Sequence, residues 1–306
     1  MKKSFCFLAA FVFAFSLVLG LGDSALAHNK HSKGISCNCF SGIYAFGDSL
    51  TDTGNLFALT GQPTEPYFEG RISNGIVWVE YLARSLRLDE SAVNNFAYAG
   101  ATTGRDNFND IPGFIEFPGL QDQLDFFELS LQGGSADPDA LYVIWAGSND
   151  FFINGGTPET VATAITNIVQ AVQRLHFAGA KHIMVFNMPD LGRTPFGLST
   201  DPVGLSLLTT IFNSELANAL DTIGSLGLET IQFDVVAVLD NIAANPKRFR
   251  FLNITDSYLE SGEGDPNRYL YWDSVHPTTR GHQVIANSAL RVLLKYKLKL
   301  FIQSLL

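Results

Sequence analysis

The chain has 306 residues, of which 46% are hydrophobic and 16% are charged, and its formal net charge at pH 7 is −10. This length and this apolar content are typical of one globular domain with a full core. The acidic balance argues against nucleic acid and anionic membranes as partners, because proteins that bind them carry basic faces. Neutral or zwitterionic lipid is not excluded.

Residues 1–27 have the features of a secretory signal peptide. Lys2 and Lys3 form a basic start, residues 5–21 are almost wholly apolar, and Ala25-Leu26-Ala27 is a small-x-small cleavage signal. We therefore expect cleavage after Ala27 and a secreted or periplasmic protein. The alternative is an uncleaved membrane anchor, for which the apolar run has a borderline length.

Residues 28–41 are predicted to form an N-terminal tail that precedes a single domain at residues 42–306. Cys37 and Cys39 are two residues apart, a spacing at which a disulfide is strained, so packing of two small side chains is the favoured interpretation. With His28 and His31 they could form a metal cluster, but the spacing matches no common zinc pattern. We expect no metal and no organic cofactor.

Five apolar segments alternate with amphipathic segments along the predicted domain. The expected strands are residues 42–46, 93–99, 140–146, 181–186 and 230–234. The expected helices are residues 74–88, 120–131, 157–177 and 205–226, and a last helix that starts at Pro277 or Thr278 and continues past Leu294. Residues 240–271 are mixed and loop-rich. This alternation predicts an α/β fold: a three-layer αβα sandwich around a central, mainly parallel five-stranded sheet.

Three of the expected strands are followed by small or polar residues, namely Ser49, Gly100 and Asn149. Adjacent parallel strands end at one edge of a sheet, which is where open α/β sheets usually bind their ligands. Ser49 follows a strand that breaks at Gly47, and it can act as a nucleophile if a base and an oxyanion pocket lie nearby. The sequence therefore predicts that three distant segments form one pocket.

The candidate base lies near the C-terminus, where Asp273 and His276 are three residues apart and Pro277 fixes the turn. At this spacing the carboxylate can accept a hydrogen bond from one ring nitrogen, which leaves the other nitrogen free to take a proton from a serine hydroxyl. An isolated histidine is usually a surface or core group, but the aspartate favours a catalytic pair. His282, on the last helix, is interpreted as a structural histidine whose ring nitrogens have partners.

Four of these segments resemble, in the same order, the sequence blocks of the GDSL-type lipases and esterases in the SGNH hydrolase superfamily. The blocks are FGDSL at residues 46–50, NFAYAGA at 95–101, GSND at 147–150 and DSVHP at 273–277, with similar segments at 187–192 and 212–216. Gly-Asp-Ser also occurs at residues 22–24, so the triplet alone carries little weight. The resemblance covers residues 40–295 and, through DTGN at 52–55, is greatest to secreted bacterial phospholipases, lysophospholipases and acyltransferases and to plant GDSL enzymes.

The resemblance implies a flavodoxin-like SGNH fold and ester hydrolysis through an acyl-enzyme. It implies that Ser49 is the nucleophile, that His276 is the general base and then the acid, and that Asp273 orients His276. The implied oxyanion hole consists of the backbone N–H groups of Ser49 and Gly100 and the side-chain amide of Asn149. Gly100 suits this role because no Cβ would block the substrate. After the signal there is no Gly-x-Ser-x-Gly, so the sharp nucleophile elbow of α/β-hydrolases is not indicated.

Several other side chains near these segments can be interpreted as structural or as functional. We expect Asp48 to bond the loop backbone and Asp150 to bond a turn or a helix end. Large apolar side chains flank the predicted site and could line an acyl groove or simply pack in the core; they are Phe108, Ile111, Phe114, Phe117, Phe126, Phe127, Phe151 and Phe152. Residues 295–301 mix basic and apolar side chains and could touch a membrane, although an extension of the last helix is the simpler interpretation.

The expected function is therefore a secreted serine ester hydrolase acting on acyl esters, with lipids as the favoured class. Its partner would be a small-molecule or lipid ester, with transient contact with a lipid surface and no nucleic acid. One alternative is an acyltransferase that moves the acyl group to an alcohol such as a sterol, and another is a carbohydrate acetylesterase. A binding protein without turnover is disfavoured because no candidate residue is missing.

Overall fold

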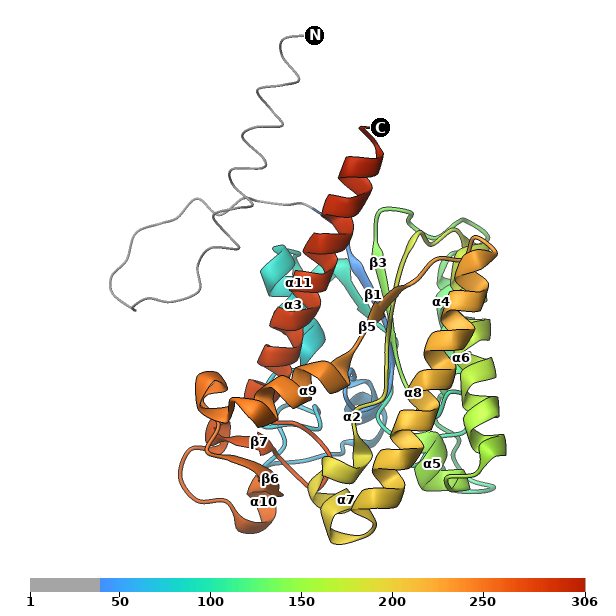
Figure 1. Cartoon of the computed structure of the whole chain (residues 1–306). Helices are drawn as coiled ribbons and strands as arrows, with labels where there is room; N and C mark the ends of the chain where they lie inside the picture. Colours follow the sequence, from blue (N-terminus) through green and yellow to red (C-terminus); the bar gives the residue numbers. More distant parts are fainter. Residues whose placement is uncertain (1–38, 306) are drawn as a thin grey trace, which may run out of the picture. The chain divides into compact units, whose positions relative to one another are not determined.

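A five-stranded parallel sheet with helices on both faces forms the centre of the computed structural model, which describes residues 39–305 (Figure 1). The strands are β1 (Ile43–Gly47), β2 (Val93–Asn95), β3 (Leu141–Trp145), β4 (His182–Phe186) and β5 (Ile231–Phe233). Their order is β2-β1-β3-β4-β5, and every neighbouring pair is parallel. The predicted α/β class and the five-stranded sheet are confirmed.

The side chains of β3 explain why both faces of the sheet are covered. All five are buried, and they alternate: Tyr142 and Ile144 enter one apolar cluster, whereas Leu141, Val143 and Trp145 enter another. The first cluster is closed by α4 (Leu120–Ser130), α6 (Pro158–Ala178) and α8 (Pro202–Ser225). The second is closed by α3 (Trp78–Leu86), α9 (Val235–Ala244) and α11 (Thr279–Gln303). A strand that is apolar throughout fits only such a doubly covered sheet.

Short elements connect the sheet and helices. They include α2 (Asn55–Thr60), α5 (Ser148–Asn154), α7 (Pro195–Ser199) and α10 (Tyr258–Ser261). The 3₁₀ turns are Glu90–Ala92, Leu191–Arg193, Pro246–Phe249 and Pro266–Arg268. Figure 1 places α2, α5 and α7 at the lower end, beyond the carboxyl ends of the strands.

Residues 230–234 contain the fifth strand, β5, as predicted, but β5 is not the last strand of the chain. The mixed region that follows contains α9 and a second parallel pair, β6 (Asn253–Ser257) and β7 (Tyr269–Tyr271). β6 has buried, intermediate and exposed residues in no strict alternation, and its register with β7 shifts between Asn253 and Ser257. Such an irregular pair leaves no period-2 pattern for sequence reasoning to find.

Two predicted elements are shorter than expected because side-chain hydrogen bonds replace regular ones. Helix α3 begins at Trp78 rather than at residue 74, since Asn74 and Ile76 accept hydrogen bonds from Thr279. Strand β2 ends at Asn95 rather than at residue 99. The Asn95 side-chain nitrogen donates to the carbonyl of Thr51, and its side-chain oxygen accepts from the Ala97 N–H. Asn and Asp side chains commonly compete with strand and helix ladders in this way.

The ends of the described region bear on the remaining predictions. Cys39 is disulfide-bonded, so the expectation that its side chain only packs is wrong. The other two cysteines lie outside the described residues, as do His28, His31 and the predicted signal peptide. Residues 295–301 belong to α11, which confirms the extension of the last helix. Among residues 39–305 no helix combines the length and the hydropathy that a membrane span requires.

Candidate active site

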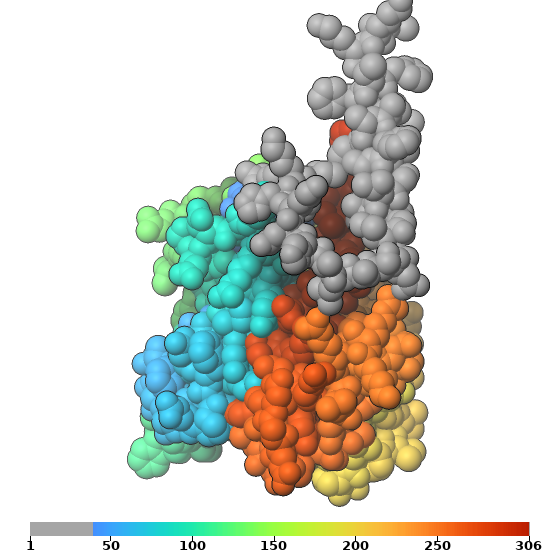
Figure 2. Space-filling view, turned by 90° about the vertical axis from the view of Figure 1, so that its left-hand side faces the viewer, coloured from blue at the N-terminus to red at the C-terminus, as the bar shows by residue number. Residues whose placement is uncertain are grey.

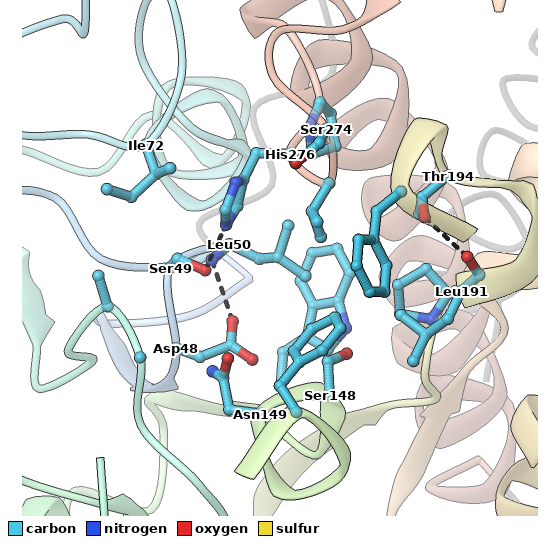
Figure 3. A pocket seen from close by; sticks show the side chains of 18 of the residues that line it. Asp48, Ser49, Leu50, Ile72, Ser148, Asn149, Leu191, Thr194, Ser274 and His276 are labelled. Atoms are coloured by element: carbon cyan, nitrogen blue, oxygen red, sulfur yellow. Dashed lines mark hydrogen bonds between the residues drawn. The ribbon is translucent and has the colours of Figure 1, made fainter. Parts of the chain in front are cut away.

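Ser49, His276 and Asp273 form a hydrogen-bonded chain at the carboxyl edge of the central sheet. Ser49 Oγ lies 2.8 Å from His276 Nε2, although the two residues are 227 positions apart in the sequence (Figure 3). His276 Nδ1 lies 2.9 Å from both carboxylate oxygens of Asp273. Asp273 Oδ1 also accepts hydrogen bonds from the backbone N–H groups of Val275 and His276, which fix the turn. The serine hydroxyl can therefore pass a proton to an imidazole that a carboxylate holds in place.

Burial and the neighbouring charges set the proton affinities of this chain. Burial disfavours the imidazolium form of His276, but the Asp273 carboxylate outweighs this effect and raises the histidine's pKa. Burial also opposes ionisation of Asp273, yet His276 and two backbone N–H groups lower its pKa to about 2. Asp273 is therefore ionised throughout the neutral range, and His276 has a stronger than usual tendency to take up a proton.

We predict that kcat/KM for a soluble ester falls as the pH decreases, with a midpoint above 6.5, the ordinary value for histidine. The reason is that only neutral His276 can accept the serine proton, and a raised pKa keeps it protonated to a higher pH. A profile from pH 5 to 9 measures the midpoint. Asp273→Asn should move the midpoint down, whereas a wild-type midpoint below 6.5 would contradict the assignment.

Three hydrogen-bond donors line the same pocket as Ser49 and His276. Among residues 39–305, the backbone N–H groups of Ser49 and Gly100 have no acceptor. The Asn149 amide donates one hydrogen bond, of 3.0 Å, to the carbonyl oxygen of Ala101, which leaves its second N–H free to face a ligand. Unpaired N–H groups beside a serine are suited to stabilise negative charge on an oxygen atom.

Gly100 has a further reason to be glycine besides leaving room for substrate. Its φ of 86° is in the left-handed region, and a Cβ would lie 2.3 Å from both Asn107 Oδ1 and Asn109 Nδ2. The two asparagine amides also bond to the carbonyl of Ala99. A larger residue at position 100 would therefore disrupt the loop itself.

Buried carboxylates hold the segments around the pocket together. Asp52 accepts hydrogen bonds from the N–H groups of Gly54, Asn55 and Leu56 on its own loop and from Ala99 on the next. Burial raises the pKa of Asp52, because four N–H donors compensate its desolvation only in part. This carboxylate fixes the Ser49 loop against the Gly100 loop.

Asp48 and Asp150 are two further buried acids beside the pocket. Asp48 accepts from the Leu50 N–H, which confirms its expected bond to the loop backbone, and burial raises its pKa to about 7. Asp150 was expected to bond a turn or a helix end, but it accepts from the N–H and the hydroxyl of Thr103 instead. Burial raises the pKa of Asp150 to about 6. Asp150 thus joins α5 to the loop that follows Gly100.

Gln123 is a supporting residue that the sequence reasoning missed. Strand β2 pairs with β1 only as far as Ala45; beyond it the Gly47 carbonyl accepts from the Tyr98 N–H at 3.2 Å, but the Gly47 N–H needs another partner. The Gln123 amide supplies one: its oxygen accepts from the Gly47 N–H and its nitrogen donates to the Gly47 carbonyl, each at 2.8 Å. The sequence feature that could have indicated this role is the position of Gln123, a polar residue on the same buried face of α4 as Leu120, Leu124 and Phe127.

A second missed group lies in the segment before α3. Tyr67 donates a hydrogen bond of 3.0 Å to Asp273 Oδ2, and the Ser73 hydroxyl donates to the carbonyl of Pro277. Figure 2 shows this segment, in blue, beside the orange and red segments near the C-terminus. Because Tyr67 and Asp273 are 206 residues apart, no local pattern could have indicated the contact.

The pocket has a volume of about 420 Å³ and a mainly apolar lining. Of the eight side chains considered for an acyl groove, only Phe108 and Phe152 line it. Phe117, Phe127 and Phe151 are buried in the core, which confirms the alternative interpretation for these three. Ile111, Phe114 and Phe126 are exposed, so neither interpretation holds for them. The rest of the large apolar lining comes from other elements and includes Trp145, Leu191, Phe196, Val235, Leu239, Tyr271 and Ile285.

His282 does not have the partners that were expected. Its side chain is fully buried near the start of α11, and neither ring nitrogen has a hydrogen-bond partner within residues 39–305. Burial, together with the charge of His276, lowers its pKa to about 3, so the ring is neutral at physiological pH. Among residues 39–305, no cluster of three or more His, Cys, Asp or Glu side chains could hold a metal ion.

Comparison with known proteins connects this geometry to a family. The family model for GDSL-like lipase/acylhydrolase matches residues 43–289. The chain is 32% identical to a phosphatidylcholine-sterol acyltransferase from Aeromonas hydrophila, over 82% of this chain and 89% of that protein. It is 26% identical to a GDSL esterase/lipase from Arabidopsis thaliana, over 81% of this chain and 86% of that protein.

A third relative is longer than this chain. An uncharacterized protein from the trpE-trpG intergenic region of Pseudomonas putida is 32% identical over 83% of this chain, but the match spans only 48% of that protein. The predicted resemblance is confirmed by the family model, which covers the strands, the pocket and the segment that carries Asp273 and His276. The chain therefore belongs to the GDSL-like lipase/acylhydrolase family of carboxylic ester hydrolases.

Proposed function

We propose that this protein is a secreted serine esterase that hydrolyses esters of long, apolar acyl chains. The observation that carries the proposal is the 2.8 Å contact between Ser49 Oγ and His276 Nε2 in the lining of a mainly apolar pocket. In this proposal Ser49 is the nucleophile, His276 is the base and Asp273 orients it. Secretion rests on the signal-peptide features of residues 1–27.

The reaction would proceed in two halves. Ser49 Oγ attacks the ester carbonyl carbon while His276 Nε2 takes the hydroxyl proton, and the resulting oxyanion accepts hydrogen bonds from the N–H groups of Ser49, Gly100 and Asn149. The C–O bond then breaks, His276 returns the proton to the leaving alcohol, and the acyl group remains on Ser49. Water attacks this acyl-enzyme with His276 again as base, which releases the carboxylic acid and restores Ser49.

The size and lining of the pocket favour a long acyl chain over an acetyl group. An acetyl group has two carbon atoms and would leave most of a cavity of about 420 Å³ unfilled. Pockets that bind a ligand well bury most of its surface against matching side chains. Val235, Leu239 and Ile285 are apolar partners for a hydrocarbon chain, and their side chains offer no hydrogen bonds to carbohydrate hydroxyls.

A second candidate is transfer of the acyl group to an alcohol. It is supported by the similarity to the Aeromonas hydrophila phosphatidylcholine-sterol acyltransferase. An apolar pocket could admit an alcohol acceptor more readily than water, and the chemistry at Ser49 would be the same. A binding protein without turnover is not favoured, because the residues proposed as nucleophile, base and oxyanion donors all line one pocket.

The proposal predicts that kcat/KM for p-nitrophenyl esters rises with acyl length from acetate to decanoate. Each buried methylene contributes up to about 0.8 kcal/mol, which corresponds to about fourfold in kcat/KM. Product analysis with phosphatidylcholine, in the presence and absence of a sterol, separates hydrolysis from transfer. A preference for acetate over every longer ester would contradict the assignment of the pocket.

A further inference from the structure

An exposed apolar hairpin stands beside the pocket, in the segment of residues 105–118. Ile111 and Ile115 exchange two backbone hydrogen bonds, of 2.9 and 3.1 Å, and these close a tight turn. Phe114, within this turn, is 87% exposed, and Ile111 and Ile115 are exposed by about half. Three large apolar side chains in one closed turn are costly to leave in water unless something covers them.

The base of the hairpin is polar and is attached to the loop that contains Ala99 and Gly100. The Phe108 N–H donates to the carbonyl of Gly100 at 2.7 Å, and the buried Asn107 amide donates to the carbonyls of Ala99 and Pro118. Asp110 accepts from the N–H groups of Asn107 and Phe117, across the neck of the hairpin. These bonds hold the apolar tip in a fixed position next to the pocket.

Other segments around the pocket also expose apolar side chains. Phe57, Ile153 and Leu198 are each about 40% exposed. Each is close in sequence to a residue that lines the pocket: Leu56 precedes Phe57, Phe152 precedes Ile153, and Phe196 lies two residues before Leu198. These side chains come from α2, α5 and α7, which lie at the same lower end in Figure 1. We call Phe57, Ile111, Phe114, Ile115, Ile153 and Leu198 the apolar rim.

We propose that the apolar rim binds the surface of zwitterionic lipid, such as a phosphatidylcholine bilayer, and so brings the pocket against its substrate. The occupant is inferred from position and charge. Each rim segment also supplies lining to the pocket that contains Ser49, through Phe108 and Asn109 in the hairpin and through Leu56, Phe152 and Phe196 in the short helices. A lipid is an occupant that can both cover these apolar side chains and place an acyl chain in the pocket. The hairpin segment carries one basic and three acidic side chains in a chain of net charge −10, which disfavours anionic lipid.

The test measures binding to phosphatidylcholine vesicles by co-sedimentation, in a Ser49→Ala background so that the lipid is not consumed. Phe114→Ser and Ile111→Ser should each weaken binding by about tenfold, because each removes a buried apolar side chain from the interface. The matched control is Phe177→Ser. Phe177 is 82% exposed but lies in the last turn of α6, which leads into the amino end of β4 at the edge of the sheet away from Ser49.

The same substitutions are then made in the active enzyme and assayed on a soluble short-chain ester, and their rates should stay within about twofold of wild type because Phe114 and Ile111 do not line the pocket. Equal vesicle binding by Phe114→Ser, Phe177→Ser and the parent would overturn the proposal, as would binding to phosphatidylglycerol vesicles alone. Binding needs no turnover. If the protein hydrolyses soluble esters but does not bind vesicles, only the proposed lipid-binding rim is wrong. If it binds vesicles through Phe114 but hydrolyses no ester, only the proposed esterase activity is wrong.

Discussion

Ser49→Ala is expected to lower kcat for p-nitrophenyl butyrate by about 10⁵- to 10⁶-fold. Without the hydroxyl no acyl-enzyme can form, and the remaining donors and the pocket can only assist direct attack by water. Ser49 Oγ contacts His276, and the hydroxyl is small, so its removal should leave the fold intact. Steady-state kinetics and thermal unfolding, measured on the same preparation, separate loss of chemistry from loss of structure.

Ser148→Ala is the matched control for this substitution. Ser148 also borders the pocket, but within residues 39–305 its hydroxyl has no hydrogen-bond partner, so activity should fall by less than about tenfold. A fluorophosphonate probe should label the wild type at Ser49, as identified by mass spectrometry, and should leave Ser49→Ala unlabelled. Substantial activity in Ser49→Ala would show that another group is the nucleophile.

Asn149→Ala is expected to lower kcat by about a hundred- to a thousandfold and to change KM little. The amide would donate to an oxygen atom that carries full negative charge only in the transition state, so its loss should affect the chemical step more than substrate binding. The substitution also removes the hydrogen bond to Ala101, which contributes about 1 kcal/mol to the free energy of unfolding. Steady-state kinetics and urea unfolding measure the two effects separately.

Asn167→Ala controls for that structural contribution. The Asn167 amide donates a hydrogen bond to Thr103, on the loop that also contains Ala101, but Asn167 does not line the pocket. Its loss should reduce stability by a similar amount and leave kcat within about threefold of wild type. If both substitutions lowered kcat equally, Asn149 would be a residue that supports the loop rather than an oxyanion donor.

Local patterns in the sequence predicted most of the secondary structure. The continuously apolar segment at β3 and the amphipathic segments at α4, α6 and α11 were predicted within a few residues, because periodicity reports burial directly. The short helices α2, α5 and α7 were not predicted, since elements of five to seven residues contain too few turns to show a period. Strands β6 and β7 were not predicted either, because buried and exposed residues do not alternate along them.

Local sequence patterns do not predict which aromatic side chains line the pocket. Phe108 and Phe114 are six positions apart in one loop, and nothing in their local sequence distinguishes them. In the folded chain both side chains are exposed, by 60% and 87%, but only Phe108 lines the pocket. The difference arises because hydrogen bonds to Gly100 and Ala99 fix the base of the hairpin and turn its tip outward.

The sequence by itself determined which segments form the five strands of the central sheet and its long helices, and the pairing of Asp273 with His276, because each depends on residues close together in the chain. Only the tertiary structure decided that His276 meets Ser49, that Gln123 completes the backbone bonding of Gly47 and that Tyr67 braces Asp273. Those contacts join residues 76 to 227 positions apart. Side-chain packing selects them across the whole domain, and packing at that range leaves no periodic trace in the sequence.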